Sequence, residues 1–231
     1  MNFDSISEFD AAEDFLKDNL RAQVLFKTWI PREKFIELLH GDDGISLSRE
    51  DDSPIAFALG ARPPLRESWK RFNIESGSTL ISEIEATEKS DWQTYFIEVP
   101  TDAIASLHPK RRSDSEIEAF LKLHAPKSSV FPGNKEIVEW ARVDEQEELV
   151  GVAAITRWES GEHVVVSVAT HSHMRGRGIG AKVMGEVLAV AQKNSITRLC
   201  LGVNGDNAPA IALYEKLGWH PLFKFTYLER E

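Results

Sequence analysis

The sequence predicts an α/β fold in which a mixed sheet is flanked by helices and preceded by an α+β N-terminal region. From residue 136 onward, short apolar runs alternate with two stretches of helical periodicity. A glycine-rich turn at 175–180 (RGRGIG) joins an apolar strand pattern to the first of these helices. Before residue 128 the patterns are shorter and less regular. The alternation of strands and helices is typical of helices packed on a sheet.

The N-terminal region mixes short helical and strand patterns. It predicts helices at 7–20, 31–40 and 115–124, two strands within 44–60 around an Asp-Asp-Ser-Pro turn, and strands at 80–84 and 92–99. Its order of a helix and then two strands resembles that of the second region, so it could be a degenerate copy of that region.

The boundary between the regions is predicted in the stretch APKSSVFPGN, which holds two prolines and a glycine. We therefore expect an N-terminal region at 1–127 and a second domain at 128–231.

The second domain has the clearer pattern. It predicts strands at 136–143, 149–157 and 163–170, a helix at 178–193, a strand at 199–203, a helix at 207–217 and a final strand at 223–228. Gly218 is a natural terminator for the second helix, and Asp206 or Asn207 can cap its start.

Composition excludes several classes of protein. The net charge is −10 and the excess acid lies mainly before residue 129, which argues against nucleic acid as a partner. The first residues are acidic and lack a basic-then-apolar signal pattern, and no apolar run approaches the roughly 18 residues of a membrane span. We therefore expect a soluble, cytoplasmic protein that does not enter a membrane.

The glycine loop can be read in two ways. Gly176, Gly178 and Ala181 fit G-x-G-x-x-A, a dinucleotide fingerprint, whereas Arg175, Gly178 and Gly180 fit R-x-x-G-x-G. In either reading the free N–H groups at the start of a helix favour an anionic ligand such as a pyrophosphate. The dinucleotide reading, and with it an oxidoreductase, is disfavoured because that loop should follow the first strand of its domain and be followed by an acidic residue about 20 residues on.

A second motif decides between the readings. NAPAIALYEKLGW at 207–219 follows the R-x-x-G-x-G loop and one intervening strand. This combination resembles the GNAT superfamily of N-acetyltransferases, which use acetyl-CoA, over about residues 135–231. The phrase SVATHSHMRGRGIG is also similar to a group of uncharacterised bacterial members with an extra N-terminal region.

The resemblance implies a set of cofactor-binding residues. The pantetheine arm would pair with the backbone of Val168, Ala169 and Thr170, one of whose amides could also stabilise the thioester oxyanion. Asn207 would bind the pantetheine or phosphate region. The pyrophosphate would be held by the loop residues Arg175, Gly176, Arg177, Gly178, Ile179, Gly180 and Ala181.

The resemblance also implies a general acid, Tyr214, whose phenol has an ordinary pKa of about 10 and can protonate the leaving thiolate. The general base stays open. In some relatives an acid occupies the strand before the asparagine motif, but this chain has Gly202 there. His163, Glu162 and a water relay are the alternatives. His171 and His173 are interpreted as loop residues, and no metal site is expected.

The predicted function is transfer of an acetyl group from acetyl-CoA to an unidentified amine by direct attack in a ternary complex. The alternative is a non-catalytic acyl-CoA-binding or regulatory module. The N-terminal region is expected to form a wall of the acceptor pocket. A homodimer stays open.

Overall fold

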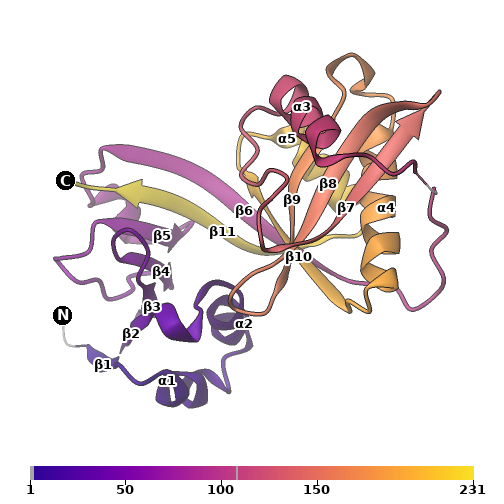
Figure 1. Cartoon of the computed structure of the whole chain (residues 1–231). Coiled ribbons are helices and arrows are strands. Elements are labelled where there is room, and N and C mark those ends of the chain that lie inside the picture. The colour runs from indigo at the N-terminus through magenta and orange to yellow at the C-terminus, as the bar shows by residue number, and fades with distance from the viewer. Residues whose placement is uncertain (1–2, 108) are drawn as a thin grey trace.

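The computed structural model describes residues 3–107 and 109–231. Residues 3–98 form an N-terminal part, residues 114–231 form a C-terminal part, and residues 99–113 connect them. Figure 1 shows the two parts side by side, with two long strands running from one into the other.

The C-terminal part follows the predicted order of elements. It contains α3 (Asp114–His124), β7 (Ile137–Glu145), β8 (Glu148–Arg157), β9 (His163–Thr170), η3 (Ser172–Met174), α4 (Ile179–Lys193), β10 (Arg198–Asn204), α5 (Ala208–Lys216) and β11 (His220–Glu229). The order of three strands, helix, strand, helix and strand is thereby confirmed. The Ser113 side chain and Glu116 form a capping box at the start of α3, and Asn207 caps α5 by accepting from the amide of Ala210.

The N-terminal part is built from shorter elements. It contains β1 (Asp4–Ile6), α1 (Phe9–Leu16), α2 (Leu20–Trp29), η1 (Arg32–Lys34), β2 (Phe35–Gly41), β3 (Gly44–Arg49), β4 (Ile55–Leu59), β5 (Arg71–Glu75), η2 (Thr79–Ser82) and β6 (Glu88–Glu98).

Two sequence predictions in this part are wrong. Residues 31–40 form a single 3-10 turn and then β2 rather than a helix, because β2 pairs with β1 on one side and β3 on the other. Residues 80–84 hold the end of a 3-10 helix, Thr79–Ser82, and the turn after it rather than a strand, because the Ser78 side chain caps that helix and Leu80 is buried in the core below.

All the strands belong to one continuous sheet in the order β1-β2-β3-β4-β5-β11-β6-β10-β9-β8-β7. The two central strands are exchanged between the parts. β6 leaves the N-terminal part and pairs with β10, from Glu98 opposite Arg198 to Trp92 opposite Asn204. β11 comes from the C-terminal part and pairs with both β6 and β5.

The two parts of the sheet share a topology. In each, a run of antiparallel strands, β1 to β4 and β7 to β9, ends in a parallel pair, β4 with β5 and β9 with β10. The crossover between β4 and β5, residues 60–70, holds no helix, whereas α4 crosses from β9 to β10. This topology supports the interpretation of the N-terminal part as a degenerate GNAT-like half. The predicted boundary at 127/128 stays a prediction.

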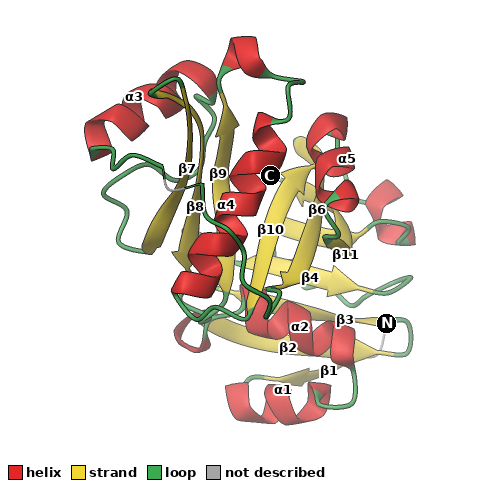
Figure 2. Ribbon diagram, turned by 90° about the vertical axis from the view of Figure 1, so that its right-hand side faces the viewer, coloured by secondary structure: helices red, strands yellow, loops and turns green. Residues whose placement is uncertain are grey.

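Helices cover both faces of the C-terminal sheet. Side chains of β8 alternate between two clusters: Ala153 and Ile155 pack with α4 and α5, while Val152 and Ala154 pack with α3. Figure 2 shows α4 and α5 on one side of the strands and α3 on the other.

An aromatic cluster joins the two parts. Trp29, at the end of α2, packs edge-on against Trp92 of β6 and Trp158 after β8, with ring centroids 5.2 and 4.7 Å away, and stacks on Phe57 of β4 at 5.8 Å. Such pairs each contribute about 1 kcal/mol beyond the burial of their area. The cluster and the exchanged strands couple the folding of the two parts.

No helix among the described residues is long and apolar enough to cross a membrane.

The exchanged strands predict that the C-terminal domain does not fold alone. A fragment of residues 128–231 lacks β6 and leaves the facing edges of β10 and β11 unpaired in the middle of the sheet. We expect the full chain to unfold in one cooperative thermal transition and the fragment to show none by circular dichroism. A cooperative transition in the isolated fragment would show that β6 is dispensable.

Candidate active site

The strands β9 and β10 pair over a very short stretch. Only Val164 with Cys200 and Val165 with Leu201 are in register. On its other side, β9 stays paired with β8 as far as Thr170. In the described part of the chain, β9 thus has no ladder partner on its β10 side beyond residue 165. An extended ligand could bond to this open edge.

A bulge at Ser167 accompanies the divergence. Ser167 has a φ of 53°, in the left-handed region that few residues other than glycine adopt, and the register of β8 with β9 shifts around it. Its hydroxyl donates to the Val130 carbonyl at 2.6 Å and accepts from the Val130 amide at 3.2 Å. The segment after α3 thereby holds the bulge in place.

The predicted glycine loop lies at the end of β9 and opens α4. Gly176 and Gly178 have φ values of 75° and 82°, which explains why glycine suits both positions. The first helical hydrogen bond runs from the Lys182 amide to the Gly178 carbonyl at 3.2 Å. The amides of residues 178–181 precede it and have no intrahelical acceptor. Four N–H groups at the positive end of α4 make a site suited to an anion.

The two loop arginines have different surroundings. The Arg175 guanidinium donates to the carbonyl of His124 at 2.8 Å, which ties the loop to the end of α3. The Arg177 side chain is exposed and has no hydrogen bond or ion pair with any described residue. Arg177 is therefore the loop cation free to meet an anionic ligand.

Histidines pack beneath this loop. The buried His124 accepts at Nδ1 from the Ser172 amide at 3.2 Å, and its ring lies 4.2 Å from that of His171, which in turn lies 5.8 Å from that of His173. Within the described chain, no group of three or more histidine, cysteine, aspartate or glutamate side chains is arranged to hold a metal ion. Sequence reasoning missed His124, because it lies about 50 residues before the loop that it holds.

Tyr214 lies on α5 and is 5% exposed. Its ring packs between those of Tyr95 and Trp219, at 6.2 and 6.1 Å. Burial raises the pKa of Tyr214 to about 12, and its hydroxyl bonds to no other described residue. The phenol therefore keeps its proton at neutral pH and has it available for donation. A Cβ on Gly180 would lie 2.9 Å from Leu213, so α5 packs directly on the start of α4.

The candidate bases lie elsewhere. Glu162 forms an ion pair with Arg198 at 2.5 Å, and His163 lines a cavity of about 320 Å³ with Ser195, Thr197 and Arg198. Burial and, secondarily, Arg157 lower the pKa of His163. Both residues lie at the start of β9, the opposite end from the glycine loop, so the structure does not bring them together with Tyr214. Gly202 is exposed beside the indole of Trp92.

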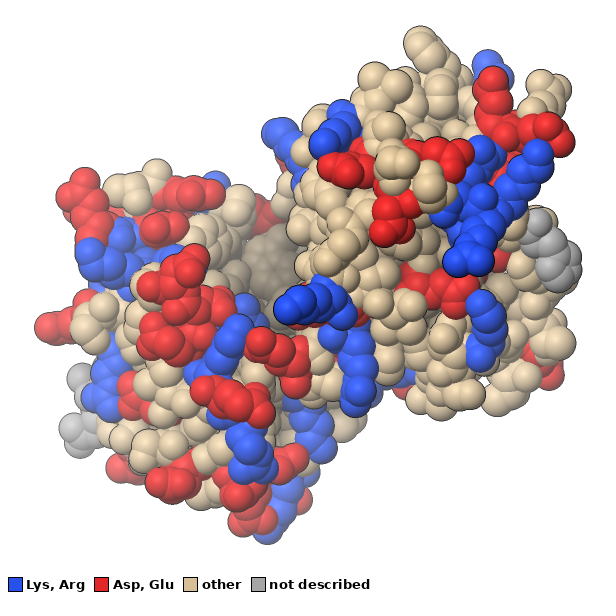
Figure 3. Space-filling view, viewed as in Figure 1, with Lys and Arg blue, Asp and Glu red and all other residues tan. Residues whose placement is uncertain are grey.

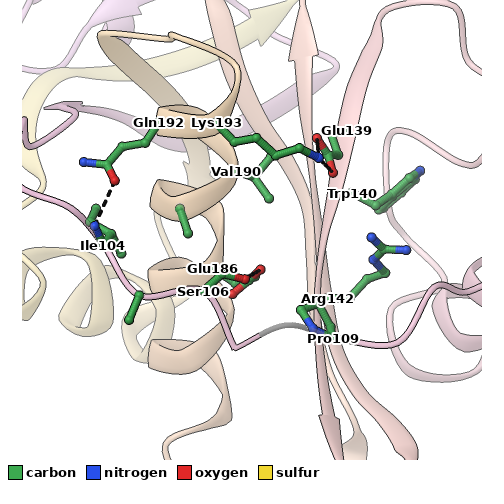
Figure 4. A pocket seen from close by; sticks show the side chains of 12 residues that line it. Ile104, Ser106, Pro109, Glu139, Trp140, Arg142, Glu186, Val190, Gln192 and Lys193 are labelled. Atoms are coloured by element: carbon green, nitrogen blue, oxygen red, sulfur yellow. Dashed lines mark hydrogen bonds and ion pairs between the residues drawn. The ribbon is translucent and has the colours of Figure 1, made fainter.

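A further cavity is separate from the opening between β9 and β10. It measures about 720 Å³ and lies between the connecting segment, α4 and β7 (Figure 4). The connecting segment is fixed there by bonds from the Ile104 amide to Gln192, at 2.9 Å, and from Ser106 Oγ and the Leu107 amide to the buried Glu186, at 2.7 and 2.8 Å. The cavity lies along the contact between this segment and α4.

The sequence that forms the loop, the bulge and the diverging strands matches a known protein family. The profile of the Acetyltransferase (GNAT) family matches residues 89–219, more than half of the chain. The chain belongs to the GNAT acetyltransferase family. The match begins at β6, earlier than the sequence motifs indicate, which agrees with the place of β6 inside the C-terminal sheet.

Solved structures of GNAT proteins have the same fold. A GCN5-related N-acetyltransferase from Sphaerobacter thermophilus superposes with a TM-score of 0.62 at 12% identity, covering 99% of this chain and 95% of that one. One from Kribbella flavida has a TM-score of 0.53 at 15% identity and coverages of 92% and 95%. An uncharacterised Mycobacterium leprae protein is 40% identical over 74 residues, which is 31% of this chain and 20% of that protein, so the match spans only a fifth of that relative.

The hydrogen bond accepted by His124 predicts a pH-dependent contribution to stability. Burial and, next, the charges of His171, Arg175 and His173 lower the pKa of His124 below its usual 6.5. Its neutral form therefore contributes stability that is complete above pH 6.5 and is lost as the pH falls through the folded-state pKa. His124→Asn keeps an acceptor near Nδ1 but does not titrate. We expect the melting temperature of the wild type to fall more than that of His124→Asn between pH 7.5 and 5.

The control for this comparison is His220→Asn, since His220 is exposed and is not among the charges that lower the pKa of His124. It should keep the wild-type pH dependence of the melting temperature. Equal pH dependence in the wild type and His124→Asn would contradict the assignment to His124.

Proposed function

We propose that the protein transfers an acetyl group from acetyl-CoA to an amine by direct attack within a ternary complex. The observation that carries this proposal is the divergence of β9 from β10 next to a helix start with four free amides. In the proposed complex the pantetheine arm lies along the open edge of β9 and bonds to the backbone of Val168, Ala169 and Thr170. The pyrophosphate lies on the amides of residues 178–181, with Arg177 beside it.

In this proposal Arg175 and Asn207 support the site without contacting acetyl-CoA directly. Arg175 positions the loop through its bond to His124, and Asn207 caps α5. Gly176 and Gly178 give the loop its left-handed turns. Ile179 is buried in the core between α4 and the sheet and anchors the start of α4, which carries the amides of Gly180 and Ala181.

The chemical step moves one acyl group and two protons. The amine nitrogen attacks the thioester carbonyl carbon, the carbon–sulfur bond breaks, and the sulfur takes the hydroxyl proton of Tyr214. The proton that the nitrogen loses passes to water, because Glu162 is held by Arg198 and His163 lies at the far end of β9. The Tyr214 phenolate then regains a proton from water, as its raised pKa requires. Backbone amides at the Ser167 bulge would stabilise the oxyanion.

A non-catalytic acyl-CoA-binding module is the second candidate. Gly202 favours it, since no carboxylate stands at that position of β10. The two functions are separated by incubating the protein with acetyl-CoA and a panel of amines. An acetyltransferase releases free CoA thiol in proportion to the amine consumed, whereas a binding module binds acetyl-CoA and releases none.

The role of Tyr214 predicts a loss of turnover without a loss of cofactor binding. Tyr214→Phe keeps the packing of the ring and removes only the proton donor, so kcat should fall about 100-fold, in the range for general acid catalysis. The affinity for acetyl-CoA should stay the same. Because the pKa of Tyr214 is raised to about 12, the wild-type rate should also show no loss from this group up to pH 10.

The matched control is Tyr227→Phe, since the Tyr227 hydroxyl bonds to Glu229 in the N-terminal half of the sheet. It should leave kcat unchanged. If Tyr214→Phe turns over at the wild-type rate while chemistry limits that rate, Tyr214 is not the acid.

A further inference from the structure

A second cavity of about 320 Å³ lies between the N-terminal and C-terminal parts. One side is formed by α2, the turn after it and β3, and the other by the segment after α3, the loop after β8 and β9. The residues that line it are Thr28, Pro31, Lys34, Arg49, Ser129, Val130, Asn134, Glu136, Trp158, Glu159, Ser160 and Val166. Figure 3 shows that the surface is hollowed between the two parts.

The cavity reaches the sheet where β9 opens. Val166 lines it and comes directly after the last residue of β9 that pairs with β10. Val130, which holds the Ser167 bulge, lines it as well. In the proposed complex a ligand in this cavity therefore lies next to the open edge that would hold the thioester.

Three direct contacts fix the two sides of the cavity to each other. Ser160 Oγ donates to the Thr28 carbonyl at 2.9 Å, Lys34 and Glu159 form an ion pair at 2.8 Å, and Trp158 packs edge-on against Trp29. All three contacts join the N-terminal part to the loop after β8. The cavity is thus a built feature of the interface rather than a gap between independent domains.

The charged side chains that line the cavity differ in whether they have an ion-pair partner. Lys34 pairs with Glu159, and Arg49 pairs with Asp51 at 3.0 Å. Glu136 is half-buried, and its carboxylate forms no hydrogen bond or ion pair with any residue that the structure describes.

The backbone of Glu136 is nevertheless well fixed. Its amide donates to Asn134 Oδ1 and its carbonyl accepts from the Arg157 amide, both at 2.8 Å. A carboxylate on an ordered backbone, without a counter-ion and beside apolar side chains, attracts a cation.

We propose that this cavity binds the acceptor and that Glu136 binds its ammonium group, which releases one proton to water before the neutral nitrogen attacks. The acceptor class is then a primary amine that is protonated at neutral pH and carries a compact apolar or aromatic body, which packs against Pro31, Val130 and Trp158. The inference rests on the proposed function, because it assigns the second substrate of that reaction. Glu136 selects the acceptor and is not a part of the cofactor site.

The test compares three probes of the same chain length that differ in charge: 3-phenylpropan-1-ammonium, 3-phenylpropan-1-ol and 3-phenylpropanoate. Their dissociation constants are measured on the full chain saturated with CoA, which prevents turnover, by ligand-observed NMR. Wild-type protein should bind the ammonium about 2- to 5-fold more tightly than the alcohol, the range for one partly exposed ion pair, and the carboxylate least.

Variants at Glu136 make the test specific. Glu136→Gln keeps the shape and both backbone bonds and should make the ammonium and the alcohol bind equally. Glu136→Lys should reverse the order and favour the carboxylate. The control Glu33→Gln removes an exposed carboxylate outside the cavity and should leave the wild-type order intact.

Four results would overturn the inference: equal binding of the three probes to the wild type, a wild-type preference for the carboxylate, an ammonium preference that survives in Glu136→Gln, or no binding of any probe. The proposed function is scored separately by release of thiol from acetyl-CoA. If the ammonium binds through Glu136 but no thiol is ever released, the transfer reaction is wrong while the assignment of the cavity stands.

Discussion

A sheet can open a gap between two of its strands only if each strand keeps its other neighbour. β9 leaves β10 after two paired residues, and both strands survive this loss because their outer edges remain paired, β9 with β8 and β10 with β6. β6 belongs to the N-terminal part of the chain, so the exchange of central strands supports the opening from the far side. β6 is therefore a structural requirement of the site.

The N-terminal part has the same strand topology but lacks the opening between its two parallel strands. Its parallel pair, β4 and β5, stays in register from Ile55 opposite Arg71 to Ala58 opposite Ile74. The crossover that follows β4 contains no helix and so offers no helix start for an anion. Within one chain, the half with a bulge, an opening and a glycine loop carries the GNAT family's cofactor motif, and the closed half does not.

Much of the C-terminal part could be predicted from the sequence because its signals are local. The periodicity of α4, the glycines of its loop and the asparagine cap of α5 all act within a few residues. The family follows from two such motifs and is confirmed by the profile match. The four apolar side chains at 35, 36, 38 and 39, by contrast, fit either a helix or a strand, and pairing with β1 and β3 determines that these residues form a strand. The exchange of β6 is likewise decided by partners more than 100 residues away.

The parts of the site that escaped prediction all depend on tertiary contacts. Nothing local marks Ser167 as the bulge, since its left-handed backbone is held by Val130. His124 ends a helix far from the loop that it supports, and Glu136 matters because its neighbours in space leave it unpaired. Conversely, Glu162 and His163 look suitable as bases in the sequence, but the fold places them at the wrong end of β9 for that role in our proposal.

The central claim is that the open edge of β9 and the start of α4 together hold acetyl-CoA. Hydrogen exchange of the backbone amides, measured by NMR with and without acetyl-CoA, tests this claim most directly. The account predicts that protection rises at residues 168–170 and 178–181 on binding and stays unchanged in β4 and β5. Binding of acetyl-CoA without added protection at those two segments, or with protection centred on the N-terminal part, would contradict it.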